Sequence, residues 1–117
     1  MVDEDDVRRL ALALPGTTEA PSHGTPAFRV RDRPFARVHQ NGGVLVLWCA
    51  HELEKASLIE SDPEVFFTTP HYDGYPLVLV RMDAIAVDRM AELLETAWYV
   101  RAPTRPREAF DAQSGAG

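Results

Sequence analysis

Residues 27–49 read AFRVRDRPFARVHQNGGVLVLWC and decide the fold. Apolar and polar side chains alternate on both sides of Arg31-Asp32-Arg33-Pro34, which predicts a β-hairpin over Ala27–Val38. This turn lacks the Asn-Gly or Asp-Gly pair that marks the tightest hairpins, so its type stays open. Asn41-Gly42-Gly43 is a second turn signal. It leads into the continuous apolar run Val44–Cys49, which is typical of a central strand.

Helical periodicity appears on both sides of this region. An apolar stripe with carboxylates in its first turn predicts a helix over residues 3–14, which Pro15-Gly16 ends. A second helix is expected over His51–Glu60, and a third begins at Asp88, its expected N-cap. The expected apolar positions of the second helix are Leu53, Ala56 and Ile59, and those of the third are Met90, Leu93, Leu94, Ala97 and Trp98.

Two shorter strands are predicted over Val65–Phe67 and Leu77–Met82, so the order is helix, three or four strands, helix, two strands, helix. Strands joined by short turns pair antiparallel. The predicted fold class is therefore α+β, an antiparallel β-sheet with the helices packed on one side. A single domain is expected over residues 1–101, and a mobile C-terminal tail over residues 102–117, where no periodicity remains.

Composition restricts the classes of function. The chain has 117 residues and a formal net charge of −6, whereas nucleic-acid binders usually carry a basic footprint. No apolar run approaches the roughly 20 residues that span a bilayer, and the acidic start is unlike a signal peptide, so a cytoplasmic protein is expected. The one cysteine, Cys49, excludes an internal disulfide and is expected to be a small buried apolar residue.

Three segments carry a resemblance to a known family. They are ALALPGTTE at residues 11–19, HGTPAFRV at residues 23–30 and PHYDGYP at residues 70–76. In their order and spacing the chain resembles the MmcQ/YjbR family over about residues 5–103. The resemblance implies a CyaY-like fold, also described as a double wing of β-hairpins, and a family label of DNA binding. It implies no catalytic residue, and fold alone does not fix function.

An arginine-rich hairpin is the first candidate site. Four arginines against one aspartate give residues 29–37 a formal charge of +3, so the rest of the chain carries −9. Arginine forks bind phosphate, and an aromatic ring beside them can stack on a base. The predicted nucleic-acid-binding residues are Arg29, Arg31, Arg33, Arg37 and Phe35, with Arg29 and Arg31 on one strand face and Phe35 and Arg37 sharing a face of the next. The alternative is a solvated sheet face with local ion pairs.

The loop before the last strand is the second candidate site. A pocket there would be formed by Trp48, His71, Tyr72, Asp73 and Tyr75, with His71 and Asp73 orienting each other as acid–base partners. The alternative is a plain turn around Asp73-Gly74, with His71 packed against an aromatic neighbour.

Other chemistry finds little support in the sequence. The histidines lack metal-ligand spacing, and phosphate loops and nucleophile elbows are absent, so no catalytic residue, metal or cofactor is assigned. The predicted function is a non-enzymatic binding module with weak, sequence-tolerant nucleic-acid binding. The alternatives are a small-molecule-binding protein or enzyme with its pocket near His71 and Trp48, and a protein-interaction or dimerising module with an apolar sheet face. The sequence leaves the oligomeric state open.

Overall fold

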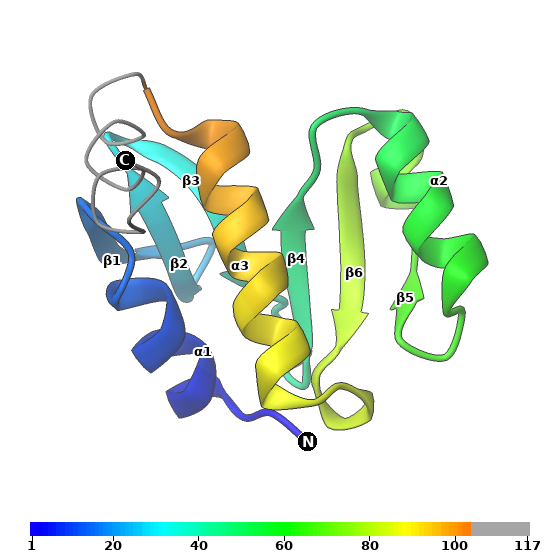
Figure 1. Cartoon of the computed structure of the whole chain (residues 1–117), viewed down its shortest axis with the longest axis horizontal. Coiled ribbons are helices and arrows are strands. Elements are labelled where there is room, and N and C mark those ends of the chain that lie inside the picture. Colours follow the sequence, from blue (N-terminus) through cyan, green and yellow to red (C-terminus); the bar gives the residue numbers. More distant parts are fainter. Residues whose placement is uncertain (104–117) are drawn as a thin grey trace, which may run out of the picture.

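The computed structural model describes residues 1–103 and has the expected element order (Figure 1). Six antiparallel strands form one sheet in the order β1-β2-β3-β4-β6-β5, and the three helices lie on one face of it. The predicted α+β class is thereby confirmed. The elements are α1 (Glu4–Leu12), β1 (Thr17–Ser22), β2 (Thr25–Val30), β3 (Arg33–Val38), β4 (Val44–Trp48), α2 (Glu52–Ser61), β5 (Phe66–Phe67), the 3-10 turn η1 (Pro70–Tyr72), β6 (Leu77–Arg81), the 3-10 turn η2 (Met82–Ala84) and α3 (Val87–Arg101).

The strand β1 is the fourth strand that the sequence left open. Its segment TTEAPS has no apolar alternation, because β1 is an edge strand with much of its surface exposed. Pro21 is tolerated there because an edge strand needs no donor on its free side. The two-residue turn to β2 is His23-Gly24, and both residues have positive φ, 54° and 80°. This is the geometry of a type I′ hairpin turn.

The turn between β2 and β3 is also of the tightest kind. Arg31 and Asp32 are its two residues, and both have positive φ, 50° and 66°. This type I′ geometry ordinarily selects Asn-Gly, so Arg31-Asp32 carries no sequence signal for it. Because Arg31 lies in the turn, the prediction that it shares a strand face with Arg29 is wrong.

A β-bulge in β3 decides which sheet face its side chains occupy. Phe28 lies opposite Ala36 rather than Phe35, so Phe35 is the extra, unpaired residue. In an unbulged hairpin with this turn, Arg37 would face the same side as Phe28, which is the core. The bulge shifts the alternation by one residue. Phe35 and Ala36 therefore both enter the core, and Arg37 joins Arg29 on the opposite face. The prediction that Phe35 and Arg37 share a face is wrong for this reason.

The main core lies between the sheet and the helices. The largest side chains that are fully buried are Trp98, Phe28, Phe35, Phe66, Leu45, Leu79, Met90, Leu94, Val7, Val30, Val46 and Val78. Of these, Val46 and Leu79 belong to a smaller cluster on the other side of the sheet, where Tyr72 packs over them. We call that side the open face, because α1, α2 and α3 all lie on the other side (Figure 1).

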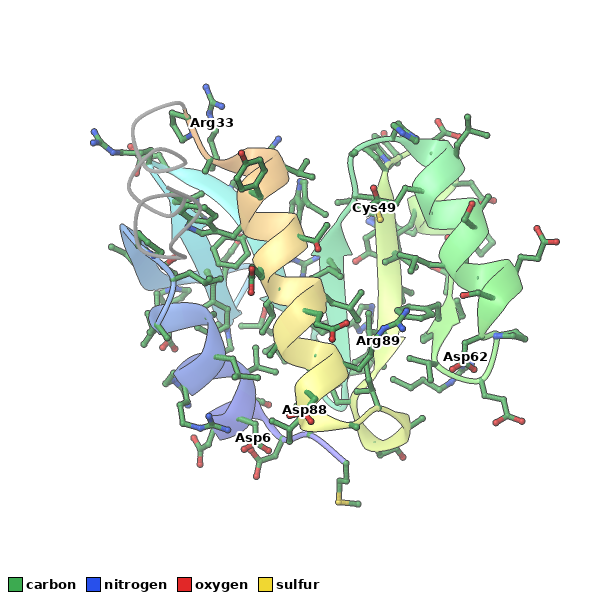
Figure 2. The ribbon with its side chains drawn as sticks, viewed as in Figure 1. Asp6, Arg33, Cys49, Asp62, Asp88 and Arg89 are labelled. Carbon is green, nitrogen blue, oxygen red and sulfur yellow. The ribbon has the colours of Figure 1, made fainter. Side chains whose placement is uncertain are left out.

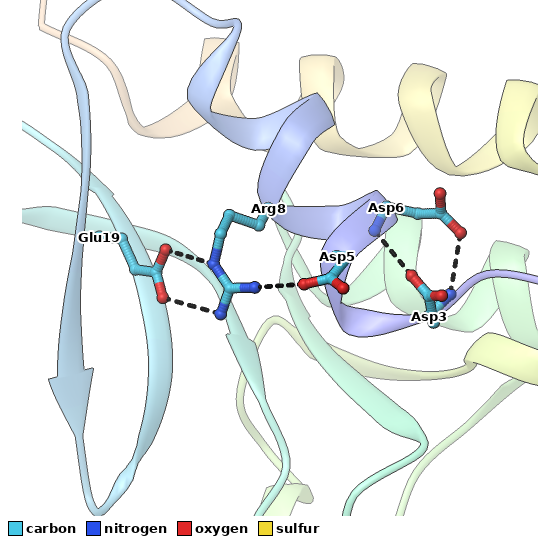
Figure 3. Close-up of polar contacts among 5 residues, drawn as sticks. All are labelled: Asp3, Asp5, Asp6, Arg8 and Glu19. Atoms are coloured by element: carbon cyan, nitrogen blue, oxygen red, sulfur yellow. Dashed lines mark hydrogen bonds and ion pairs between the residues drawn. The ribbon is translucent and has the colours of Figure 1, made fainter.

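The helix α1 begins with a capping box. The Asp3 carboxylate accepts from the Asp6 N–H at 2.8 Å, and the Asp6 carboxylate accepts from the Asp3 N–H at 3.1 Å (Figure 3). This backbone hydrogen bond from Asp3 lowers the pKa of Asp6. The Arg8 guanidinium contacts Glu19 of β1 at 2.7 Å and Asp5 at 2.8 Å, which ties α1 to the edge strand. The hydrogen bond with Glu19 raises the pKa of Arg8.

The start of α3 differs from the prediction. The helix begins at Val87, Ala86 occupies the N-cap without a side-chain hydrogen bond, and Asp88 lies inside the first turn (Figure 2). The predicted N-cap at Asp88 is therefore wrong, although its carboxylate still lies at the positive end of the helix dipole. At the other end, Ala102 is buried rather than part of a tail. The remainder of the predicted tail, residues 104–117, lies outside the described residues.

Cys49 follows β4 directly and is buried, as expected (Figure 2). Burial, with a smaller contribution from the Glu54 carboxylate, raises the pKa of its thiol to about 12. The thiolate is the reactive form, and at pH 8 a pKa near 12 leaves on the order of one thiol in 10⁴ ionised. None of the helices in residues 1–103 is long and apolar enough to cross a bilayer.

We expect Cys49 to resist a disulfide thiol reagent at pH 8 while the protein is folded. Modification should proceed at the rate of opening or unfolding, and in urea the same thiol should react at once, because an unfolded cysteine has a pKa of about 8.5. Absorbance of the released thiol measures both rates. Complete modification of the native protein within the time of the unfolded control would contradict this prediction.

Candidate functional site

The open face carries the side chains that could recognise a ligand. Its β2 and β3 strands contribute Arg29 and Arg37, and its β4 and β6 strands contribute Trp48 and Leu77, which lie opposite each other in the register. The loop between β5 and β6 folds back over this face, and its Tyr72 covers the apolar side chains beside the arginines. Members of both predicted sites, Arg29 and Arg37 of the arginine hairpin and Tyr72 of the His71 loop, thus lie together on this face.

A hollow of about 440 Å³ occupies this place, within the ~300–1,000 Å³ common for small-molecule sites. Its lining residues are Ser22, His23, Arg29, Pro34, Arg37, Trp48, His71, Tyr72, Tyr75 and Leu77. A second hollow of about 490 Å³ adjoins it, and the two share His23, Arg37, His71 and Tyr72. The second is completed by His39, Gln40 and Thr69.

The two arginines of the pocket each carry a buried nitrogen without a partner. Among residues 1–103, three buried side-chain polar atoms have no hydrogen-bond partner, and two of them are Arg29 Nε and Arg37 Nη1. Arg37 Nη2 donates to the Tyr72 hydroxyl at 2.9 Å, which fixes the Arg37 side chain over the sheet. A buried donor without a partner costs about 1–3 kcal/mol, and an acceptor in the hollow reaches these two nitrogens only if the guanidinium groups move.

The charge of the site is opposite to that of the chain. The formal net charge is −6, yet among the described residues no aspartate or glutamate lines either hollow. Two arginines and three histidines do. The histidines do not form a metal site, because no three His, Cys, Asp or Glu side chains within residues 1–103 lie in suitable positions. The arrangement fits an anion.

One wall of the pocket is held by a buried lysine that the sequence did not indicate. Lys55 of α2 is 7% exposed, and its Nζ donates to the backbone carbonyls of Tyr72 at 2.7 Å and Tyr75 at 3.1 Å. The predicted apolar face of α2 is wrong at Leu53, which is 76% exposed, and at Ala56, which is also exposed. A hydrophobic pattern cannot find Lys55, because its burial depends on carbonyls that are 17 and 20 residues away. In the same loop, Gly74 has φ 83°, the left-handed conformation that favours glycine.

The predicted pairing of His71 with Asp73 is not formed. His71 lies edge-on against the Tyr72 ring at 4.9 Å between ring centroids, as the alternative interpretation expected. Asp73 lies in a separate depression beside Lys55 and Ala56 of α2. Asp73 is therefore not a pocket residue, whereas Trp48, His71, Tyr72 and Tyr75 are.

Three of the five predicted nucleic-acid-binding residues lie elsewhere. Phe35 is 0% exposed in the main core, so it has no face free to stack on a base. Arg31 is exposed in the hairpin turn. Arg33 is on the helix side, where its Nη1 donates to the Arg101 carbonyl at the end of α3 at 3.3 Å (Figure 2). Only Arg29 and Arg37 reach the pocket.

The sequence also missed His23. It occupies the first position of the β1–β2 turn with φ 54° and lines both hollows. Non-glycine residues in this conformation are uncommon, and such residues cluster at functional sites. The His-Gly pair between two strands was the available signal, but β1 carries too little pattern to identify the turn.

Comparisons with known proteins agree with this fold. A family model described as YjbR matches residues 12–100. Uncharacterized proteins Rv2570 of Mycobacterium tuberculosis and Mb2600 of Mycobacterium bovis are each 36% identical to this chain, over 98% of it and 100% of their own length. The crystal structure of the Deinococcus radiodurans protein DR2400, with a domain named DUF419, superposes with a TM-score of 0.73. It is 22% identical and covers 98% of this chain and 89% of its own.

Proposed function

This chain belongs to the YjbR family, and we propose that it binds a small organic anion in the pocket of the open face. The anionic group would lie against Arg29 and Arg37, and Tyr72 would hold Arg37 in position. This proposal develops the small-molecule alternative from the sequence and adds two arginines of the hairpin to its pocket.

The observation that carries the proposal is the pair of arginines, Arg29 and Arg37, in a lining to which residues 1–103 contribute no carboxylate. Hydrogen bonds between an arginine and a carboxylate or phosphate are about twice as strong as neutral ones. One nitrogen of each guanidinium, Arg29 Nε and Arg37 Nη1, is buried without a partner, so folding supplies it no acceptor. An anion in the pocket would pair with guanidinium groups that no carboxylate of the lining neutralises.

Binding to nucleic acid is less well supported. Duplex DNA presents phosphates along an extended line, and non-specific binders neutralise several of them at once. Of the four arginines in the hairpin, two are in the pocket, whereas Arg31 and Arg33 are at the turn and on the helix side. The interaction-module alternative also loses support, because Tyr72 already covers Val46 and Leu79 on the open face.

Binding rather than catalysis is favoured by the positions of the ionisable groups. A general acid–base pair requires its members within hydrogen-bond reach. His71 packs on Tyr72, and Asp73 lies beside α2 instead. The histidines in the lining can donate to an anion without taking part in a reaction.

We expect Arg37→Gln and Arg29→Gln each to weaken binding of a small anionic probe by about 10- to 100-fold, the loss that one charged hydrogen bond commonly gives. Phenyl phosphate and benzoate are suitable probes, and two-dimensional NMR titration measures both affinity and location. The shifted amides should belong to the loop of residues 70–77 and to β2 and β3.

Arg31→Gln is the matched control, since it removes the same charge from the same hairpin outside the pocket. It should leave the affinity within about twofold, because a surface charge contributes little at this distance in salt. The proposal fails if no small anion shifts the pocket amides, or if Arg31→Gln weakens binding as much as Arg37→Gln. Tight, salt-dependent binding of a duplex oligonucleotide by the Arg31 surface would instead support the nucleic-acid alternative.

A further inference from the structure

The pocket also has an apolar and aromatic half, which adjoins the arginines. Pro34, Trp48, Leu77 and Tyr75 form it, Pro34 lies opposite Arg29 in the register, and 58% of Tyr75 is exposed. An exposed tyrosine beside a half-buried tryptophan is a common arrangement for holding a flat ring, because such rings bury much area with little loss of side-chain freedom. A simple inorganic anion would leave this half of the site unused.

One face of the Trp48 indole is already occupied. The Arg101 guanidinium lies 5.9 Å from the ring centroid, and Arg101 Nε donates to the Pro34 carbonyl at 2.9 Å, which fixes its place. A second ring would stack on the other face of Trp48. The cation on the first face leaves the indole in a defined orientation, as a stacking surface requires.

The two halves are separated by a short, definite distance. Arg37 pairs with Val46, and Trp48 is two residues further along the same strand. With strands about 4.8 Å apart and a rise of about 3.3 Å per residue, the Cα atoms of Arg37 and Trp48 are about 8 Å apart. At this spacing one small molecule can contact both Arg37 and Trp48, with a linker such as a sugar between its anionic group and its ring.

The donor set favours phosphate over carboxylate. A carboxylate is satisfied by one arginine fork. Here two guanidinium groups from different strands line the pocket, and the Tyr72 hydroxyl lies 2.9 Å from Arg37 Nη2. A phosphate monoester has three terminal oxygens and a charge of about −1.5 to −2 at neutral pH, so it can accept from all three groups.

We propose that the ligand is a phosphate monoester joined through a short linker to a flat ring, the chemistry of a nucleoside 5′-monophosphate. The phosphate binds Arg29 and Arg37, the ring stacks on Trp48, and Tyr75 covers it. This inference rests on the proposed function and specifies its ligand. The same chemistry occurs in a free mononucleotide and at the 5′-phosphorylated end of a single strand.

The test is a titration with four compounds, in which binding is measured by calorimetry or from the NMR signal of the Trp48 indole. Adenosine 5′-monophosphate should bind at least about tenfold tighter than adenosine or ribose 5-phosphate, since one stacked base and one charged contact each contribute about that factor. The fourth compound, indole-3-acetate, joins a ring to a carboxylate and should bind more weakly than the nucleotide. A 5′-phosphorylated single-stranded oligonucleotide, compared with its unphosphorylated form, tests whether the pocket binds the end of a strand as well as a free mononucleotide.

Two variants assign the halves of the site. Tyr75→Ala, which removes an exposed ring, should weaken the binding of adenosine 5′-monophosphate by about tenfold and leave the affinity for ribose 5-phosphate unchanged. Arg37→Gln should weaken the binding of both phosphates and leave the affinity for adenosine unchanged.

The inference is overturned if ribose 5-phosphate binds as tightly as the nucleotide, or if indole-3-acetate binds more tightly. In both cases the proposed binding of an organic anion stands. If none of the anions binds, the proposed function itself has failed.

Discussion

Replacing Trp98 with alanine is expected to lower the free energy of unfolding by about 3–5 kcal/mol, the range for removal of a large aromatic side chain from a core. Trp98 is 0% exposed and is the largest fully buried residue of the described chain. Its Nε1 donates to the Pro15 carbonyl at 2.9 Å, which joins α3 to the turn after α1. The variant therefore loses packing, and it leaves a carbonyl without its donor. Urea denaturation followed by circular dichroism measures the change.

Two further variants separate these contributions. Trp98→Phe keeps a ring in the core and removes the hydrogen bond, so it should cost less than the alanine variant. Glu95→Ala changes an exposed residue of the same helix and should stay within about 0.5 kcal/mol of the parent protein. A loss below about 1 kcal/mol for Trp98→Ala would show that α3 is not held by this residue.

The sequence predicts the order of elements because most of them carry their own period. The apolar runs of β4 and β6 divide between the main core and the smaller cluster on the open face, as expected of central strands, and the apolar stripe of α3 faces the core. The sequence does not predict where a bulge shifts the alternation of side chains between the two faces of a strand. The bulge at Phe35 leaves the local pattern intact, and only the pairing of Phe28 with Ala36 shows that Phe35 and Arg37 face opposite sides of the sheet.

The composition of the pocket is likewise not predictable from local sequence, because its residues are far apart in the chain. Arg37, Trp48 and His71 were each selected from the sequence, but as members of two separate sites. They meet because β4 pairs with both β3 and β6, which brings the loop before β6 over the face of the hairpin. That strand order depends on how the whole sheet assembles, and no local window of residues contains it.

Lys55 supports the backbone of the pocket wall. Its replacement by methionine has the second largest expected effect on stability. Methionine fills a similar volume but cannot donate, so the Tyr72 and Tyr75 carbonyls would lose the Nζ contacts of 2.7 and 3.1 Å. We expect a loss of about 2–4 kcal/mol in the free energy of unfolding, since a hydrogen bond from a charged donor contributes about 1.5–3 kcal/mol and the Tyr72 carbonyl keeps only its bond from the Tyr75 N–H, at 3.2 Å. Part of the loss is recovered because a buried ammonium no longer needs to be desolvated.

The effect should also be local, since Lys55 is the side chain through which α2 holds the backbone of the pocket wall. The amides of Tyr72, Asp73 and Tyr75 donate within their own turn, so hydrogen exchange at these positions should accelerate more than exchange in β4. Ser57→Met places the same residue at an exposed position of α2 and should change neither stability nor exchange. If Lys55→Met weakens phenyl phosphate binding while the Ser57 variant does not, the lysine positions Tyr72, and through its hydroxyl Arg37, for the anion. Unchanged exchange in the loop, with full stability, would show instead that the turn around Gly74 holds the pocket wall without help from α2.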